Sequence, residues 1–189
     1  MLNLTRKFGQ YYFSSVNTSH IKNVSVIGGG QMGTGIAYVA SKIGKIDTVQ
    51  IIDLNEQTLT HSQKFIEGLL NKEIKKSKIT EQDKADVLSR IVFSSSLQDA
   101  KDTNFVIEAV NEDLTLKKKI FQELDNITDP DTILATNTSS LSITKIAAFT
   151  KRPDKVIGMH FMNPVPVMEG VELIKALQTS QETQDITSL

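Results

Sequence analysis

The 189-residue sequence contains no cysteine, which excludes disulfide bonds, thiol catalysis and cysteine-based metal sites. It also lacks any apolar run approaching the roughly 18 residues that a membrane-spanning helix needs. With 21 basic and 22 acidic side chains, the net charge of -1 provides no overall field for nucleic acid or an anionic membrane. We therefore expect a protein that neither binds nucleic acid nor inserts into a membrane.

Candidate metal ligands are also sparse. The three histidines, His20, His61 and His160, lie too far apart in the sequence to suggest a local zinc motif, so we expect no metal site. Hydrophobic residues nevertheless make up 39% of the chain, which is enough for one globular domain with a real core.

Acidic residues are missing from the start of the chain, since no Asp or Glu precedes Asp47. Residues 1–20 combine Arg6 and Lys7 with Ser, Thr, Asn and aromatic side chains. This composition is typical of a mitochondrial transit segment, whose helix is amphipathic and cationic. We expect residues 1–20 to be such a segment, directed to the mitochondrial matrix. A short disordered extension is the alternative.

From Asn23 onward, short runs rich in Val and Ile alternate with stretches of helical periodicity, as in a mainly parallel sheet covered by helices. The apolar spacing predicts helices over 56–76 and 117–124. Thr80 followed by Asp83 marks another helix start, so residues 56–89 are expected to form a helical hairpin. Strands are expected over 23–28, 48–53, 91–94, 104–110, 132–136 and 155–160.

The segment GGGQMG at residues 28–33 satisfies the G-x-G-x-x-G pattern directly after the first expected strand and at the opening of a helix. Gly28 permits the tight turn, Gly30 lets a pyrophosphate approach the backbone, and Gly33 allows close packing of helix and strand. Asp53 ends the second strand twenty residues later, where its carboxylate can bind ribose hydroxyls and would repel a 2'-phosphate. A helix cap is the alternative for Asp53. The pattern predicts a Rossmann-type, doubly wound α/β fold that binds NAD rather than NADP.

A second group of residues, GMHFMNPVPVMEGVE at 158–172, places His160 at the end of an expected strand, where open α/β sheets bind ligands. A histidine there can take a hydroxyl proton while hydride leaves the same carbon. A purely structural, hydrogen-bonded histidine is the alternative. An acidic partner would orient the ring, and a Pro-Val-Pro turn could bring back either Glu169 or Glu172. Spacing alone does not choose between these two.

Together these motifs resemble the NAD-dependent L-3-hydroxyacyl-CoA dehydrogenases, which act in fatty-acid β-oxidation. The resemblance runs from about Ile21 to Ser188. It implies an N-terminal NAD-binding domain over residues 21–177 that oxidises (S)-3-hydroxyacyl-CoA to 3-oxoacyl-CoA. The segments that carry it are VIGGGQMGTGIA, the strand ending at Asp53, EAVNEDLTLKKKIFQEL, ATNTSSLSIT and GMHFMNPVPVMEGVELIK.

The resemblance also implies individual roles. His160 is the expected catalytic base and Glu172 its partner, which leaves Glu169 on the surface. Ser139 and Asn163 are expected to hold the reacting oxygen and the nicotinamide region, although turn capping is the alternative for both. The positions expected to contact the cofactor are Gly28, Gly30, Gln31, Met32, Gly33, Asp53, Glu112, Lys117, Ser139 and Asn163.

Acyl-CoA is the substrate that the resemblance implies, with Ser139 and Lys76 as its expected contacts. Lys76 lies in the helical hairpin, where cations could meet the phosphates of CoA. A solvated lysine face is the alternative for Lys76, and plain surface charge is the alternative for Lys117.

Chains of this family continue into an all-helical second domain that supplies dimer contacts and closes the acyl-CoA site, whereas this sequence stops at Leu189. We expect residues 178–189 to be the polar start of a linker, cut before it can pack. A homodimer is expected only for the full-length family protein. The competing hypotheses are a non-catalytic NAD-binding or structural protein, and a dehydrogenase of small hydroxy acids, which would leave HFMNPVPV unexplained.

Overall fold

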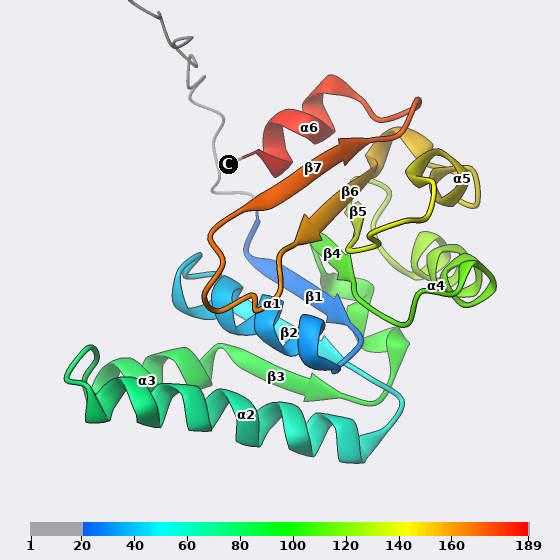
Figure 1. Ribbon diagram of the computed structural model, residues 1–189. Helices are drawn as coiled ribbons and strands as arrows, with labels where there is room; N and C mark the ends of the chain where they lie inside the picture. The colour runs from blue at the N-terminus through cyan, green and yellow to red at the C-terminus, as the bar shows by residue number, and fades with distance from the viewer. Residues whose placement is uncertain (1–20, 189) are drawn as a thin grey trace, which may run out of the picture.

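The computed structural model describes residues 21–188 and contains one seven-stranded sheet in the order β3-β2-β1-β4-β5-β6-β7 (Figure 1). Strands β1 to β6 all run parallel to one another, and the edge strand β7 runs antiparallel to β6. Strand order reverses at β1, as in a doubly wound sheet, so the predicted fold class is confirmed. The strands are β1 (Asn23–Ile27), β2 (Thr48–Ile52), β3 (Ile91–Ser94), β4 (Phe105–Glu108), β5 (Ile133–Thr136), β6 (Val156–Phe161) and β7 (Val171–Lys175).

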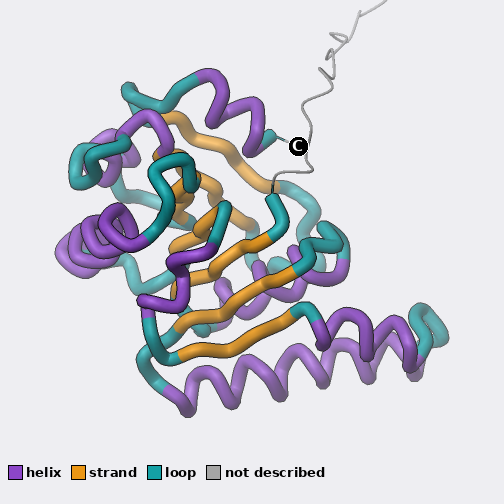
Figure 2. Tube along the Cα trace, turned by 180° about the vertical axis from the view of Figure 1, so that it is seen from behind, coloured by secondary structure: helices purple, strands orange, loops and turns teal. Residues whose placement is uncertain are grey.

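Helices cover both faces of this sheet (Figures 1 and 2). Successive strand residues face opposite cores: Val26 packs with α1 and α2, whereas Ile27 belongs to the core that α4 and α5 cover. Burial on both faces explains the continuous Val and Ile runs. The helices are α1 (Gln31–Lys42), α2 (Glu56–Lys75), α3 (Glu81–Ser89), α4 (Leu114–Ile127), α5 (Ile143–Ala147) and α6 (Gln181–Thr187), with 3-10 turns η2 (Leu97–Asp102) and η3 (Pro153–Lys155).

The predicted helical hairpin over residues 56–89 is confirmed as α2 and α3. Thr80 starts α3 with a capping box: its hydroxyl accepts the N–H of Asp83, whose carboxylate accepts the N–H of Thr80. The expected helix over 117–124 is longer than predicted. It begins at Leu114 because the Asp113 side chain accepts the N–H of Leu116 and caps the first turn.

Strand β7 was not predicted, because its sequence VELIK lies at a sheet edge where only Leu173 is half-buried and the other four side chains are exposed. It follows the Pro-rich turn and returns antiparallel along β6. We expected the chain to fold back after the Pro-Val-Pro turn, and it does so as the paired strand β7.

Residues 181–187 form helix α6, so the expectation that they do not pack was wrong. Thr183 is fully buried, and its hydroxyl donates to the Asp154 carbonyl at 2.9 Å. Thr187 donates to the Thr183 carbonyl, and Ile186 packs against the core. A polar sequence can be buried here because each hydroxyl has a carbonyl acceptor.

The expected transit segment, residues 1–20, lies outside the described residues, as does His20. Within residues 21–188, every helix is too short or too polar to cross a membrane.

Candidate functional site

The glycine turn lies between β1 and α1 and has the shape that a pyrophosphate requires. Gly28 has a φ of +104°, and a Cβ there would lie 2.8 Å from the Ala109 carbonyl oxygen. A Cβ on Gly33 would lie only 1.9 Å from the Gly28 oxygen, so α1 approaches the turn too closely for any side chain. By contrast, a Cβ on Gly30 would meet nothing within 4 Å. Gly30 starts α1 without a side-chain cap, so its open side can receive phosphate oxygens at the helix N-terminus.

Asp53 lies directly beside this turn. Its Oδ2 accepts the Gly29 N–H at 2.8 Å, and its Oδ1 accepts the Asn55 N–H at 2.9 Å. The helix-cap alternative was wrong, because the residue that caps α2 is Asn55. Each carboxylate oxygen keeps a lone pair, so Asp53 can still accept hydrogen bonds from ribose hydroxyls. The glycine turn and Asp53 together fit the adenosine diphosphate part of NAD.

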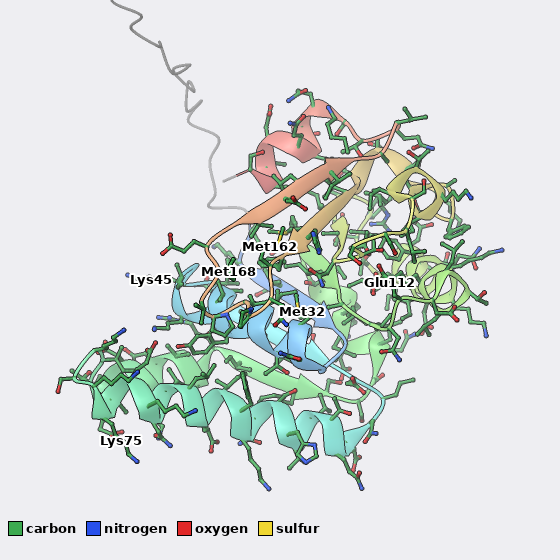
Figure 3. All side chains as sticks on the ribbon, in the orientation of Figure 1. Met32, Lys45, Lys75, Glu112, Met162 and Met168 are labelled. Atoms are coloured by element: carbon green, nitrogen blue, oxygen red, sulfur yellow. The ribbon has the colours of Figure 1, made fainter. Side chains whose placement is uncertain are left out.

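A cavity of about 320 Å³ lies at the carboxyl ends of β4, β5 and β6, next to the start of α1. Figure 3 shows the labelled Met32, Met162 and Glu112 near these strand ends. The cavity is lined by Met32, Ala109, Val110, Glu112, Asn137, Ser139, His160, Phe161, Met162 and Asn163. Six of the predicted catalytic and cofactor-contacting residues therefore meet around one space, namely Met32, Glu112, Ser139, His160 and Asn163 in its wall and Glu172 behind His160.

His160 and Glu172 face each other across the antiparallel pair β6 and β7. The His160 Nδ1 lies 2.9 Å from the Glu172 Oε2. The His160 side chain is 24% exposed and the Glu172 side chain 63% exposed. Glu169 lies in the loop before β7 and is exposed. Strand register thus brings Glu172 to the imidazole and leaves the other ring nitrogen, Nε2, available for a ligand.

Glu112 fixes the turn that follows β5. Its Oε1 accepts the Thr138 hydroxyl at 2.5 Å and the Ser139 N–H at 2.8 Å, with longer contacts to Ser140. Burial opposes ionisation of this carboxyl, but these hydrogen bonds and the nearby Lys117 ammonium outweigh it. They lower the pKa of Glu112 from 4.5 to about 2. Glu112 is therefore ionised at neutral pH.

Lys117 is buried, so the surface-charge alternative was wrong. Its Nζ lies 2.6 Å from Glu108 Oε1 and 3.4 Å from Glu112 Oε2, with both Lys117 and Glu108 at most 1% exposed. The Lys117 Nζ also donates to the Val110 carbonyl at 3.4 Å. The ammonium thus donates two hydrogen bonds and lies within ion-pair distance of a second carboxylate, and Lys117 does not line the cavity. It lies behind Glu112.

Asn163 and Gln31 connect the two motifs across the cavity. The Gln31 amide donates to Asn163 Oδ1 at 3.2 Å, joining α1 to the loop after β6. Asn137, which follows β5, holds the end of β6, since its Oδ1 accepts the Phe161 N–H at 2.9 Å. The side-chain NH₂ of Asn163 is left free to donate to a ligand.

Lys76 lies away from this cavity. It is exposed and follows the last residue of α2 at the end of the hairpin, where Figure 3 labels its neighbour Lys75. Within residues 21–188, no cluster of His, Cys, Asp or Glu could hold a metal ion.

Sequence reasoning did not single out Glu108, Thr136 or Thr138, although all three are buried and belong to the Glu112 network. One signal was present. An acid inside the strand FVIE is costly to bury without a cation, so the position of Glu108 could have indicated a buried basic partner.

Glu112 gives a pH-dependent prediction. Because its folded pKa lies below 4.5, it stabilises the fold above that pH, and the stabilisation is lost as pH falls toward 2. Glu112→Gln should lower the free energy of unfolding at pH 7 by about 1–2 kcal/mol, a reduced value because the side chain is 36% exposed. Urea denaturation should show the difference shrinking between pH 4.5 and 2. Glu169→Gln is the control, and a constant difference at all pH values would contradict the prediction.

Comparison with known proteins gives consistent matches. Residues 23–188 match the family described as 3-hydroxyacyl-CoA dehydrogenase, NAD binding domain. The chain is 47% identical over 163 residues to a 3-hydroxybutyryl-CoA dehydrogenase of Bradyrhizobium diazoefficiens, covering 86% of this chain and 55% of that protein. It is also 47% identical over 170 residues to the mouse protein named hydroxyacyl-coenzyme A dehydrogenase, mitochondrial, covering 86% of this chain and 53% of that protein.

The fold is also similar to solved structures. The (S)-3-hydroxybutyryl-CoA dehydrogenase of Ralstonia eutropha superposes with a TM-score of 0.85 and 45% identity, covering 89% of this chain and 59% of that chain. The chain spans just over half the length of these relatives.

Proposed function

The chain belongs to the 3-hydroxyacyl-CoA dehydrogenase family, as its NAD-binding domain, and from this premise we propose that it binds NAD and abstracts the proton in the oxidation of (S)-3-hydroxyacyl-CoA to 3-oxoacyl-CoA. The observation that carries the proposal is the 2.9 Å contact between His160 and Glu172 at the wall of the cavity. The NAD-binding half of the proposal is also supported by the glycine turn and Asp53.

NAD⁺, when bound, accepts the hydride that leaves C3 of the substrate. The domain holds the cofactor through the open side of Gly30 and the first turn of α1, which face the pyrophosphate. Asp53 accepts hydrogen bonds from the adenosine ribose. Glu112 and Ser139 lie in the cavity wall, on the side where the nicotinamide end would extend.

His160 takes the proton of the 3-hydroxyl. In the tautomer whose Nδ1–H donates to Glu172, Nε2 carries the free lone pair that would accept the substrate proton. When Nε2 accepts the proton, the ring becomes a cation, and the Glu172 carboxylate stabilises it. The substrate thus loses one proton to His160 and one hydride, and the C3–O bond becomes a carbonyl.

Ser139 and Asn163 orient the reacting oxygen. The Asn163 NH₂ can donate to that oxygen as it becomes a carbonyl, without competing for the proton that His160 accepts. Ser139 follows the carboxyl end of the neighbouring strand β5 and is held by Glu112. We extend the proposal to Lys76, whose exposed ammonium could pair with a phosphate of CoA at the hairpin.

The experiment that tests this function is NADH oxidation by the 189-residue chain with acetoacetyl-CoA, together with NADH binding measured by fluorescence. We expect binding by the chain, and turnover that depends on His160. Failure to bind NADH would contradict the proposal. Binding without turnover, unchanged when the remaining half of the Bradyrhizobium relative is joined to the chain, would favour a non-catalytic NAD-binding protein.

We propose further that the protein acts in β-oxidation in the mitochondrial matrix, with residues 1–20 as the import segment. The support is the acid-free, basic composition of those residues and the similarity to the mouse mitochondrial protein, although a bacterial relative is equally identical. A fluorescent protein fused to the C-terminus should colocalise with a matrix marker, and deletion of residues 1–20 should abolish this. Cytosolic fluorescence from the intact fusion would contradict the proposed location in the mitochondrial matrix.

A further inference from the structure

Glu108 is the most deeply buried acid of the described chain, and the proposed reaction does not use it. It ends β4, the strand beside β1, and its side chain is fully buried. Its Oε1 accepts the Lys117 ammonium at 2.6 Å and the Val110 N–H at 2.7 Å, and its Oε2 accepts the Thr136 hydroxyl at 2.7 Å. The carboxylate is thus held on both oxygens.

Stability alone does not account for this ion pair. Desolvating a carboxylate and an ammonium costs several kcal/mol per ion, and an apolar pair of similar volume is often at least as stable. Removing only one partner, however, leaves a buried charge without compensation. The pair therefore locks Lys117 in place, because the ammonium cannot leave Glu108 without that cost.

The locked ammonium points toward Glu112, whose Oε2 lies 3.4 Å from Nζ. The other oxygen of Glu112 holds the turn after β5 through the Thr138 hydroxyl and the Ser139 N–H. An oxygen has two lone pairs, so these two short contacts dominate over the longer contacts to Ser140. Thr138 in turn accepts the Leu141 N–H at 3.0 Å.

This turn carries Ser139 into the cavity wall beside His160. The contacts run without a break from the buried sheet to the cavity: a hydrogen-bonded ion pair joins Glu108 to Lys117, a longer ion pair joins Lys117 to Glu112, and hydrogen bonds join Glu112 to the turn.

We propose that Glu108 is a positioning residue: by holding Lys117 against Glu112, it fixes the turn at residues 138–141 and so the place of Ser139 in the site. This inference rests on the proposed function for the role of Ser139 as a site residue. The claim that Glu108 holds the turn at residues 138–141 is independent of that function. Without the Glu108 charge, Lys117 is no longer held against Glu112, and Glu112 loosens its hold on Thr138 and Ser139.

The test is amide hydrogen exchange on the 189-residue chain without NADH. Glu108→Gln keeps the size of the side chain and removes its charge. We expect exchange of the Ser139 and Leu141 amides to accelerate roughly 10- to 100-fold, the loss of about one charge-assisted hydrogen bond. Thr132→Val is the matched control. It removes a buried hydroxyl that donates to Thr103 from just before β5 and should leave the turn unchanged.

A double-mutant cycle separates positioning from general destabilisation. If Glu108 acts through Lys117, adding Glu108→Gln to a Lys117→Met chain should cause no further acceleration at the turn. The double variant buries a neutral pair, so it remains informative if the single variant unfolds. An equal acceleration in both backgrounds, or a rate within twofold of the wild type in Glu108→Gln, would overturn the proposal.

NADH binding separates this inference from the proposed function. We expect Glu108→Gln to raise the Kd for NADH roughly tenfold, because Glu112 and Ser139 line the cavity. Faster exchange with an unchanged Kd would contradict a role in positioning the site. If the wild-type chain does not bind NADH, the proposed function fails, while the exchange rates still decide whether Glu108 holds the turn.

Discussion

Replacing His160 by Asn should lower the turnover of acetoacetyl-CoA roughly 10²- to 10⁴-fold, the usual contribution of a positioned general acid or base. In this reducing direction the imidazolium donates the proton that it accepts during oxidation. Asn cannot exchange a proton at neutral pH, yet it keeps a polar group of similar reach in the cavity wall. The affinity for NADH should change little, since we propose that the cofactor is held mainly by the glycine turn and Asp53. The measurement is kcat in the NADH oxidation assay, beside a fluorescence titration with NADH.

Two carboxyl variants sharpen this prediction. Glu172→Gln keeps the size of the side chain but removes the charge that we propose orients the imidazole and stabilises its cationic form, so kcat should fall. Glu169→Gln changes an exposed loop carboxylate and should behave as wild type. Equal effects of the two variants on kcat would show that the contact between His160 and Glu172 does not contribute to catalysis. Undiminished turnover in His160→Asn would remove His160 as the base.

Gly33→Ala should abolish NADH binding and lower the free energy of unfolding by about 3 kcal/mol or more, because the new Cβ would lie 1.9 Å from the Gly28 oxygen. That oxygen belongs to the backbone, so α1 must move away from β1 to make room. The same movement would displace the N-terminal turn of α1 from the phosphates. Urea denaturation and NADH fluorescence measure the two effects separately.

Two other glycines serve as controls, because a Cβ on either meets nothing within 4 Å. Gly30→Ala should keep the fold but weaken NADH binding, since its Cβ points to the side from which the pyrophosphate approaches. Gly68→Ala lies inside α2 and should leave NADH binding unchanged while stabilising the helix by about 0.5–1 kcal/mol. A Gly33→Ala protein with wild-type stability and NADH affinity would contradict the packing argument.

Local sequence patterns predicted the α/β class, the central strands and the helical hairpin. These elements are encoded by neighbours in the chain: Val and Ile runs for strands buried on both faces, helical periodicity in α2, and the Thr80 capping box. The glycine turn was predictable for the same reason, because its sequence motif lies within residues 28–33.

The choice of Glu172 over Glu169 needed the tertiary structure or the family resemblance. Spacing from His160 allows both acids, and only the antiparallel pairing of β7 with β6 places residue 172 opposite residue 160. Strand β7 itself escaped prediction because an exposed edge strand shows no hydrophobic alternation. Helix α6 escaped for a related reason, since the hydroxyl of its buried Thr183 donates to the Asp154 carbonyl, far away in the sequence.

The residues that we propose for cofactor binding and proton transfer therefore belong to motifs that are visible in the sequence: G-x-G-x-x-G, the acid after β2, and a histidine near the end of β6. The environment of each group is set by contacts between distant segments. Glu108 and Lys117 lie nine residues apart, yet the strand and helix that carry them must pack before either charge is buried. The burial and pairing of these charged groups depend on contacts between distant segments, which a short stretch of sequence does not specify. Turn motifs and hydrophobic periodicity, by contrast, can be recognised from neighbouring residues.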